Sequence, residues 1–512
     1  MIKLSLAEIA DITSARLHGV STADADRIRV TGSVEFDSRK VTQGGLFVAI
    51  VGERVDGHDF AGAAFSAGAV AMLGIRPVEG PSLVVGNPLA ALAALATAVT
   101  RRLPELTVVG ITGSSGKTST KDLLASVVER LGPTVAPPGS FNNELGHPYT
   151  VLCCDESTRY LILEKSARGV GHITELTRIA PPRIGAVLNV GRAHVGEFGS
   201  IDVTARAKGE LVEALPPADS GGVAVLNADD PLVAAMADRT RARVVRFGVG
   251  PRREGADPID VTASNVVLDD AGRPRYTLHT PAGAVDIALR LHGEHQVSNS
   301  LAVATIALEL GMSVSAVADA LSVAVPRSAG RMQVTRRDDG VTIIDDSYNA
   351  NPDSMRAGLS ALSAMRTPVT SHSPEAETPS PGSGRLWAVL GYMGELGPAE
   401  RAEHAALGFT VTSLGIDRLV VVGDAAQAIH TAAIARAEAW QGSSELVSNT
   451  DAALALLHSQ LRPGDVVLVK ASRSVRLERI VRGLLDESQA LNASQTTETD
   501  LHTLISNKEG TA

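Results

Sequence analysis

The 512-residue chain is poor in several features, and each scarcity excludes a class of protein. Cysteine occurs only twice, at the adjacent positions Cys153 and Cys154, so a disulfide framework is excluded. Long apolar runs and a signal-peptide pattern are missing, and we therefore expect a cytoplasmic protein without stable membrane insertion. Aromatic residues make up only 3%, which predicts cores built from Ala, Val and Leu. The net charge of −10 argues against a nucleic-acid partner, because phosphate backbones are bound by clustered Lys and Arg.

Short β-branched runs alternate with helical patterns along most of the chain, which predicts an α/β protein with mostly parallel sheets. At roughly 100–200 residues per domain, the length indicates three domains. We expect a small N-terminal α/β domain, a central domain of the P-loop ATPase type with a mostly parallel sheet, and a Rossmann-like C-terminal domain. A Pro-, Ser- and Thr-rich insertion should be mobile, and the polar tail should be disordered. The predicted boundaries are 1–103, 104–324 and 325–487 for the domains, 366–386 for the insertion and 488–512 for the tail.

One stretch of the chain carries a phosphate-binding pattern, in which an apolar run ending at Ile111 leads into a Gly/Ser loop and then a long amphipathic stretch. In such strand–loop–helix units, backbone N–H groups hold phosphate oxygens, a lysine reaches the terminal phosphates and a hydroxyl holds Mg²⁺. The usual spacing G-x-x-x-x-G-K-S/T is not met, because Ile111 stands at the first glycine. A plain turn with a solvated lysine is the alternative. The loop residues are Gly113, Ser114, Ser115, Gly116, Lys117, Thr118 and Ser119.

Two other predicted strands end in polar groups. Glu164 closes the run YLILE, and His194 follows IGAVLNV. Parallel sheets bind ligands at the carboxyl ends of their strands, so we expect the loop, the carboxylate and the imidazole to lie at one edge. Oxygen ligands suit Mg²⁺, which makes Thr118 and Glu164 candidates. A single histidine at a strand end is more often structural.

Taken together, the motifs resemble those of the Mur ligases. The matching stretches are FDSRKVTQGGLFVAIVGERVDGHDF, GITGSSGKTSTKD, FNNELGHPYT, NVGRAHVGEFGS, AKGEL, LHGEHQVSNSLA, GRMQV, DDSYNANPDSM and LVKAS. They run in the family's order over residues 36–472. FNNELGHPYT and YNANPDSM are similar to the members that add D-alanyl-D-alanine to a UDP-N-acetylmuramoyl-tripeptide.

The resemblance implies an ATP-dependent amide ligase that acts at the last cytoplasmic step of peptidoglycan precursor synthesis. The N-terminal domain would bind the UDP-sugar-peptide, the central domain would bind ATP, and the C-terminal domain would move. The substrate carboxylate would attack the γ-phosphate of ATP, and the amino group of D-alanyl-D-alanine would then displace phosphate from the acyl phosphate. The implied cofactors are ATP and Mg²⁺, expected as two ions. The implied partners are the UDP-tripeptide and the dipeptide, and we expect a monomer.

The resemblance also assigns roles to residues. Lys117, Lys208 and His194 form the implied catalytic set. Lys208 is similar to a lysine that the family carbamylates, which would turn a cation into an oxygen ligand. The implied metal ligands are Thr118, Glu164, His194 and Lys208. The implied nucleotide contacts beyond the loop are Asn299, Arg331, Asp346, Tyr348 and Asn349. The implied substrate contacts are Ser38, Arg39, Asn142, Asn143 and Asn351.

Two positions depart from the family's pattern. Lys165 follows Glu164 where a small or apolar residue is usual, and strand alternation places it on the opposite face, so we expect no loss of activity. Tyr392 stands where GYMGELG would carry an acidic residue, and its contribution stays open.

Two other interpretations of the function remain. Another ligase of the superfamily, such as a diaminopimelate-adding, lysine-adding or folylpolyglutamate-type enzyme, is opposed by FNNELGHPYT. A homologue that binds the UDP-peptide without turnover is opposed by the retention of Lys117 and Lys208.

Overall fold

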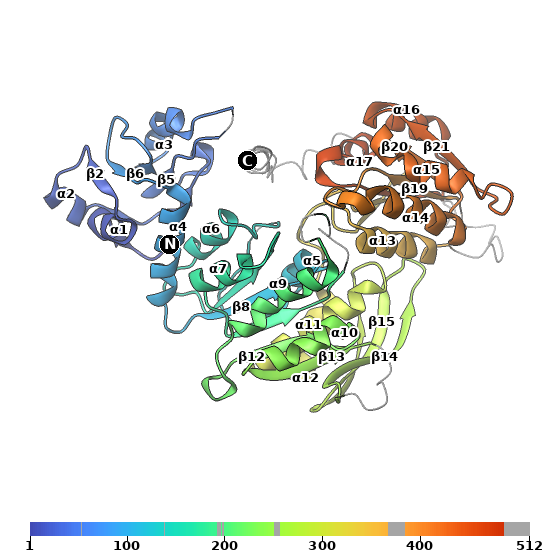
Figure 1. Cartoon of the computed structure of the whole chain (residues 1–512), viewed down its shortest axis with the longest axis horizontal. Coiled ribbons are helices and arrows are strands. Elements are labelled where there is room, and N and C mark those ends of the chain that lie inside the picture. Colours follow the sequence, from blue (N-terminus) through green and yellow to red (C-terminus); the bar gives the residue numbers. More distant parts are fainter. Residues whose placement is uncertain are drawn as a thin grey trace.

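The computed structural model describes residues 1–485 except 53, 138, 192–195, 197–198, 250–256 and 367–383. His194, most of the predicted insertion 366–386 and the predicted tail 488–512 therefore lie outside the described residues. Three α/β domains follow one another along the chain, as the sequence predicts (Figure 1). Among the described helices, none combines the length and apolarity needed to cross a membrane.

The N-terminal domain is built on a five-stranded sheet. Its elements are β1 Leu4–Ser5, α1 Leu6–Thr13, β2 Arg16–His18, α2 Thr22–Arg27, β3 Arg29–Val30, β4 Val34–Glu35, η1 Ser38–Lys40, β5 Gly45–Val48, η2 Gly57–Phe60, α3 Ala61–Ser66, β6 Ala69–Gly74, β7 Ser82–Val84 and α4 Pro88–Arg101. The strand order is β2-β7-β6-β5-β4, with β2 antiparallel and the other neighbours parallel. A separate short pair, β1 with β3, is antiparallel.

The central domain contains a nine-stranded mixed sheet. Its elements are β8 Thr107–Thr112, α5 Lys117–Val128, β9 Thr134–Val135, α6 Gly146–Leu152, β10 Tyr160–Glu164, α7 His172–Ile179, β11 Ile184–Val187, α9 Ile201–Glu213, η3 Ala218–Ser220, β12 Val223–Asn227, α10 Pro231–Ala234, η4 Ala235–Arg239, β13 Arg243–Gly248, β14 Val261–Leu268, β15 Pro274–Thr280, β16 Gly283–Ala288, α11 His295–Glu309 and α12 Val314–Val323. The order is β16-β15-β14-β13-β12-β11-β8-β10-β9. Strands β9 to β14 run parallel with β8, and β14, β15 and β16 form an antiparallel extension.

The C-terminal domain has a six-stranded sheet. Its elements are β17 Gln333–Arg336, β18 Thr342–Asp345, α13 Pro352–Ala364, β19 Leu386–Leu390, η5 Gly397–Ala399, α14 Glu400–Ser413, β20 Arg418–Val422, η6 Asp424–Ala426, α15 Gln427–Ile434, β21 Ser443–Val447, α16 Thr450–Gln460, β22 Val466–Lys470, η7 Arg473–Val475 and α17 Glu478–Leu484. The order is β17-β18-β22-β19-β20-β21, and all neighbours are parallel except the edge pair β17–β18.

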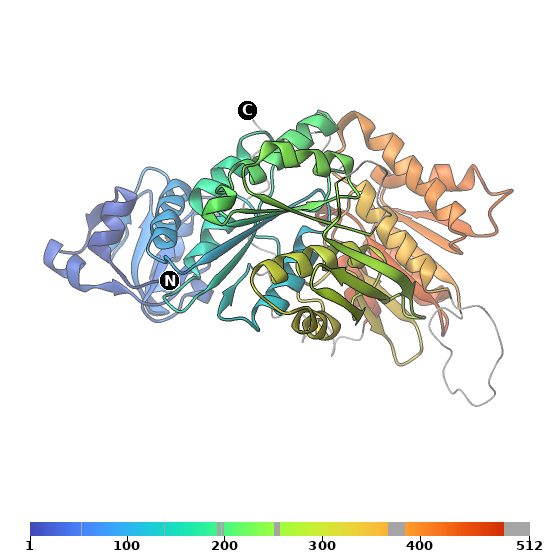
Figure 2. The same cartoon turned by 90° about the horizontal axis from the view of Figure 1, so that it is seen from below.

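Helices cover both faces of the central sheet (Figure 2). Val109 and Ile111 of β8 pack with apolar residues of α5 and α11 on one face. Leu161 and Leu163 of β10 pack on the other face, with residues of α4 and α6. This alternation follows from the pleat of the strands, because successive side chains point to opposite faces. We call the α5/α11 side the front face and the α6/α7 side the back face.

Candidate functional site

The predicted phosphate loop joins β8 to α5 at the carboxyl edge of the central sheet. Gly116 precedes the helix with φ of 79°, a left-handed conformation that glycine adopts without strain. A Cβ atom there would come within 2.6 Å of Asn299 Oδ1, so Asn299 lies directly against the loop. Asn189, at the end of the neighbouring strand β11, accepts hydrogen bonds at 2.9 Å from the backbone N–H groups of Ser114 and Ser115. Asn189 thus holds the loop in shape.

Lys117 begins α5 and bends back over the loop, where its Nζ donates to the carbonyl of Gly113 at 2.6 Å. Burial lowers the pKa of Lys117, Glu164 counteracts this by attraction, and Arg331 adds to it by repulsion. Lys117 thus lies between the negative charge of Glu164 and the positive charge of Arg331. A bound phosphate would add negative charge beside Lys117 and would stabilise its ammonium form.

Glu164 is the second feature of this edge and is fully buried at the end of β10. Its Oε2 accepts a hydrogen bond of 3.2 Å from Asn142 Nδ2, whereas its Oε1 is buried and has no hydrogen-bond partner among the residues that the structure describes. An ionised carboxylate oxygen left without a partner costs free energy unless something else binds it. The geometry therefore brings together Glu164 and Asn142, and leaves one oxygen for a cation.

Lys208 lies on α9, is 3% exposed, and faces the same edge. Burial lowers the pKa of Lys208 well below its usual range, and the neighbouring charge of Lys117 lowers it further. Thr118 is also buried, and its hydroxyl lies 2.8 Å from Ser140 Oγ. Within the described part of the chain, no group of three His, Cys, Asp or Glu side chains is placed to hold a metal. A Mg²⁺ ion here would be coordinated by the carboxylate of Glu164, by the hydroxyl of Thr118 and by oxygens that do not come from Asp or Glu.

The C-terminal domain reaches this edge through two side chains. Arg331 Nη2 donates to Thr118 Oγ1 at 3.3 Å and to Ser140 Oγ at 3.1 Å, and its guanidinium lies 4.3 Å from the centre of the Tyr348 ring. Asn351 Nδ2 donates to the carbonyl of Ser114 at 3.3 Å. A cavity of about 410 Å³ opens at this junction, and its lining includes Thr118, Ser140, Arg331, Tyr348 and Arg473.

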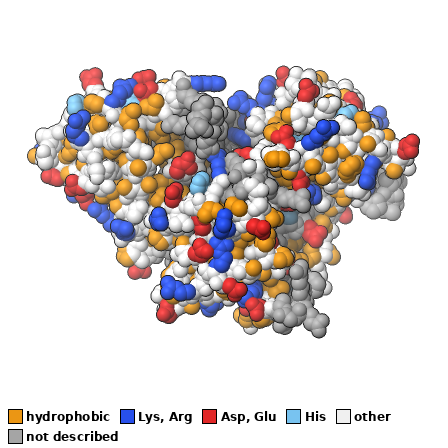
Figure 3. Space-filling view, in the orientation of Figure 1, with side chains coloured by type: hydrophobic (Ala, Val, Ile, Leu, Met, Phe, Trp, Pro, Cys, Tyr) orange, Lys and Arg blue, Asp and Glu red, His pale blue; other side chains and the backbone are white. Residues whose placement is uncertain are grey.

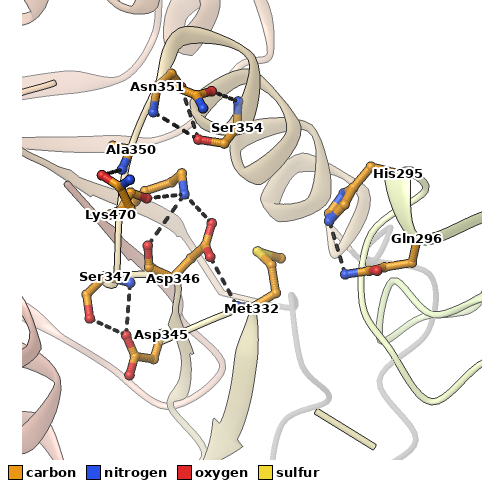
Figure 4. A network of polar contacts seen from close by, with 11 residues as sticks. His295, Gln296, Met332, Asp345, Asp346, Ser347, Ala350, Asn351, Ser354 and Lys470 are labelled. Carbon is orange, nitrogen blue, oxygen red and sulfur yellow. Dashed lines mark hydrogen bonds and ion pairs between the residues drawn. The ribbon is translucent and has the colours of Figure 1, made fainter. Parts of the chain in front are cut away.

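Lys470 explains how the segment after β18 is held (Figure 4). Its buried Nζ lies 2.5 Å from Asp346 Oδ2 and donates to the carbonyl of Asn349 at 2.9 Å. Asp346 also accepts from the backbone N–H of Met332, next to Arg331, at 3.2 Å. Lys470 therefore fixes the predicted nucleotide contacts relative to one another. Asn349 itself is exposed. Lys470 is the lysine of the LVKAS motif, so the sequence marks the residue but not its contact with Asp346.

The remaining predicted residues lie farther from the loop. Ser38 and Arg39 are in η1 of the N-terminal domain, where Asp37 accepts from the backbone N–H of Arg39 at 3.0 Å and pairs with its guanidinium at 2.9 Å. Asn143 Oδ1 accepts from the N–H of Gly146 and thereby starts α6. The structure places Ser38 and Arg39 on the N-terminal domain, which lies to the left of α5 in Figure 1.

The two departures from the family pattern have defined surroundings. Lys165 lies on the back face, as alternation predicts, and its Nζ is 2.9 Å from Nε2 of His147. Burial lowers its pKa to about 7. Tyr392 donates to Glu400 at 2.6 Å and stacks on His404, and the hydrogen bond to Glu400 raises its pKa to about 12. An acidic group is therefore still present at this place, as the Glu400 carboxylate behind the tyrosine hydroxyl.

Comparison with known proteins agrees with this geometry. Family models match residues 31–107 (Mur ligase family, catalytic domain), 111–307 (Mur ligase middle domain) and 330–473 (Mur ligase, glutamate ligase domain). A Mycobacterium tuberculosis protein named UDP-N-acetylmuramoyl-tripeptide–D-alanyl-D-alanine ligase is 50% identical, covering 95% of this chain and 98% of that protein. The MurF structure from Acinetobacter baumannii has a TM-score of 0.78 at 29% identity, covering 94% and 98% of the two chains. The MurF ligase of Thermotoga maritima in complex with ADP has a TM-score of 0.72 at 28% identity, covering 91% and 99%. The chain belongs to the Mur ligase family.

Proposed function

We propose that this chain joins D-alanyl-D-alanine to UDP-N-acetylmuramoyl-tripeptide at the expense of ATP and forms the UDP-N-acetylmuramoyl-pentapeptide precursor of peptidoglycan. The observation that carries the proposal is the gathering of Lys117, Glu164 and Lys208 around the phosphate loop, with Arg331 and Asn351 reaching it from the C-terminal domain. Relatives that carry this activity in their names cover nearly the whole chain.

The reaction requires two anions, ATP and a carboxylate, to be held together. Phosphoryl transfer is catalysed mainly by positioning and by neutralising charge. Lys117 and Arg331 supply positive charge beside the loop, and the backbone N–H groups at the start of α5 would hold phosphate oxygens. The substrate carboxylate attacks the γ-phosphate and forms an acyl phosphate and ADP. The amine of D-alanyl-D-alanine then attacks the acyl carbon and releases phosphate.

Magnesium fits the residues present. Glu164 Oε1 is a buried carboxylate oxygen without a hydrogen-bond partner in the described part of the chain, and Thr118 lies in the first turn of α5 after the phosphate loop. Mg²⁺ prefers oxygen ligands of this kind, and when bound it would neutralise phosphate charge. We propose Thr118, Glu164, His194 and Lys208 as its ligands, for two ions in all.

Carbamylation of Lys208 is part of the proposal. An ammonium buried beside Lys117 is unfavourable, and the neutral amine that burial favours is the form that reacts with CO₂. The product would carry a negative charge next to Lys117 and offer oxygens to a metal. Modification would thus turn a repulsive pair into an attractive one.

The other predicted contacts complete the proposal. Ser38 and Arg39 would bind the UDP group, Asn142, Asn143 and Asn351 would contact the peptides, and Asn299, Asp346, Tyr348 and Asn349 would line the nucleotide site. On the face seen in Figure 3, Lys and Arg side chains are interspersed with Asp and Glu. We propose small-molecule substrates and no nucleic-acid partner, in line with the net charge of −10. We propose a monomer that works in the cytoplasm.

Phosphate release tests the function. Purified protein would be given ATP, Mg²⁺ and UDP-N-acetylmuramoyl-tripeptide, with D-alanyl-D-alanine, with a free diamino acid or with no acceptor. We expect release only with the dipeptide. In a parallel assay a shorter UDP-peptide replaces the tripeptide, and phosphate release there with the diamino acid would instead assign another Mur activity. Tight binding of UDP-tripeptide without release under any condition would identify a binding-only homologue.

A further inference from the structure

Lys165 is a buried lysine that the reaction does not use directly. Its side chain is 0% exposed and runs along the back face of the central sheet. Its Nζ lies 2.9 Å from His147 Nε2, 3.2 Å from the carbonyl of Leu176 and 3.4 Å from the carbonyl of Ala180. One lysine therefore connects the end of β10 with α6 and with the C-terminal end of α7.

The neighbouring strand leaves room for this arrangement. A Cβ atom on Gly110 of β8 would come within 3.1 Å of Lys165 Cε and within 3.0 Å of Leu211 Cδ1. Contacts of that length are tighter than side chains normally accept, so Gly110 allows the lysine stem to cross β8. Filling the same space with an apolar side chain would avoid burying an amine, and apolar replacements of buried polar groups are often neutral or stabilising. A requirement for packing alone does not explain the lysine.

His147 connects Lys165 to the site. The backbone N–H of His147 donates to the carbonyl of Asn143 at 2.9 Å, and the N–H of Ser166 donates to the carbonyl of Asn142 at 3.4 Å. On the front face, Asn142 Nδ2 donates to Glu164 Oε2. The segment 142–147 is therefore attached to the end of β10 on both sides of the sheet, by Asn142–Glu164 in front and by His147–Lys165 behind.

We propose that Lys165 is a positioning residue. Through His147 it holds the segment 142–147 against the end of β10, and this keeps Asn142 hydrogen-bonded to Glu164 so that the carboxylate presents its other oxygen, Oε1, to a divalent cation. The inference rests on the proposed function, because it assigns Glu164 to the metal of that reaction.

The test compares Lys165→Met, His147→Leu and the double variant with wild type. The first readout is Mn²⁺ affinity in the presence of ADP, measured from the EPR signal of free Mn²⁺. The second is thermal stability, and the third is the Mg²⁺ dependence of phosphate release. The matched control is Leu163→Met, another fully buried position on the same face of β10.

We expect Lys165→Met to weaken Mn²⁺ binding about five- to tenfold and to raise the Mg²⁺ concentration for half-maximal rate by a similar factor. The double variant should recover thermal stability, because an apolar pair fills the space, without recovering the cation affinity. Leu163→Met should bind Mn²⁺ like wild type.

Wild-type Mn²⁺ affinity in the double variant would overturn the inference and leave Lys165 a packing residue. If Lys165→Met fails to fold, His147→Leu supplies the same comparison, since Lys165 keeps its two carbonyl partners there. The Mn²⁺ measurement needs no acceptor, so a failure of the dipeptide-dependent reaction is seen separately in the wild-type assay.

Discussion

Glu164 and Lys165 are neighbours in the chain, both are fully buried, and they lie on opposite faces of the central sheet. On the front face, one oxygen of Glu164 has no hydrogen-bond partner among the described residues. At the same edge of the sheet, burial lowers the pKa values of Lys117 on α5 and of Lys208 on α9. On the back face, Lys165 Nζ has three polar partners within 3.4 Å, and the other ring nitrogen of His147, Nδ1, has none among the described residues. Buried polar groups are normally hydrogen-bonded, so the unpartnered oxygen of Glu164 indicates a place for a ligand, whereas the well-partnered amine of Lys165 indicates a structural role.

The difference predicts opposite consequences for the lysines. A lysine at the phosphate-loop edge should matter more for turnover than for stability, because burial already opposes its charged form in the free protein. The back-face lysine should matter for stability and only indirectly for turnover. The predictions that follow test this division.

The largest effect is expected for Lys117→Ala. Loss of its charge at the transferring phosphoryl group should lower kcat by roughly 10³-fold or more. The melting temperature should change little, because the variant is relieved of the burial that disfavours the ammonium but also loses its attraction to Glu164. Phosphate release and thermal melts with and without ATP would measure both. A stable variant with near-normal kcat would refute the role of Lys117, and a large loss of stability would break the comparison.

Lys208, which reaches the phosphate-loop edge from α9, provides the second test of the candidate site. If it carries a carbamate, removal of CO₂ from the buffer should lower the rate, and bicarbonate should restore it. Lys208→Met should lose about 10²-fold in kcat and become insensitive to bicarbonate, because removing a group that stabilises charge in a buried site costs about this factor. ¹³C NMR after addition of ¹³C-bicarbonate would detect the carbamate directly. A wild-type rate that is independent of CO₂, with no such signal, would leave Lys208 an ordinary buried amine.

The phosphate loop and Glu164 could be predicted from the sequence because their chemistry is local. A glycine loop after an apolar run and a carboxylate at a strand end are visible without knowledge of the fold, and parallel strands bring such ends to one edge. Strand alternation was also sufficient to place Lys165 on the back face. The three-domain α/β class followed from the alternation of strands and helices.

Partners across long sequence distances could not be predicted in this way. Asn189 holds the loop from the next strand, and Lys470 holds Asp346 across 124 residues. His147 lies 18 residues before Lys165, and nothing in its local pattern connects the two. Such contacts depend on strand order and helix packing, which motifs do not encode. The role of His194 and the positions of the domain boundaries stay predictions.

On the back face, Lys165→Ala is expected to lower the free energy of unfolding by about 2–4 kcal/mol. The truncation leaves a cavity and removes the donor for two carbonyls and His147, and both effects are destabilising. Urea unfolding would measure the change. Lys117→Ala is the matched front-face truncation and should show no such loss. Equal free energies of unfolding for Lys165→Ala and Lys117→Ala would contradict the proposed difference between the structural lysine and the lysine of the phosphate loop.

Glu35 is a third buried ionisable group, and its hydrogen bonding is intermediate between that of Glu164 and that of Lys165. It is 8% exposed at the contact of the N-terminal and central domains, and Tyr149 Oη lies 3.3 and 3.4 Å from its two oxygens. Burial raises its pKa to about 7, and the hydrogen bond from Tyr149 offsets part of that rise. The carboxyl is thus only partly satisfied, and its ionisation opposes folding.

The smallest expected effect is the pH dependence of Glu35→Gln. A folded pKa near 7 above an ordinary value of 4.5 means that the native state binds more protons between these values, so wild-type stability falls as the pH rises through that window. Glutamine removes this loss. The variant should match wild type near pH 4.5 and exceed it by about 1–2 kcal/mol at pH 8. Glu8→Gln is the control of opposite sign, because hydrogen bonding to Ser5 lowers the pKa of Glu8 and its ionised form caps α1. A Glu35→Gln gain that is equal at both pH values would show that ionisation of Glu35 is not the cause.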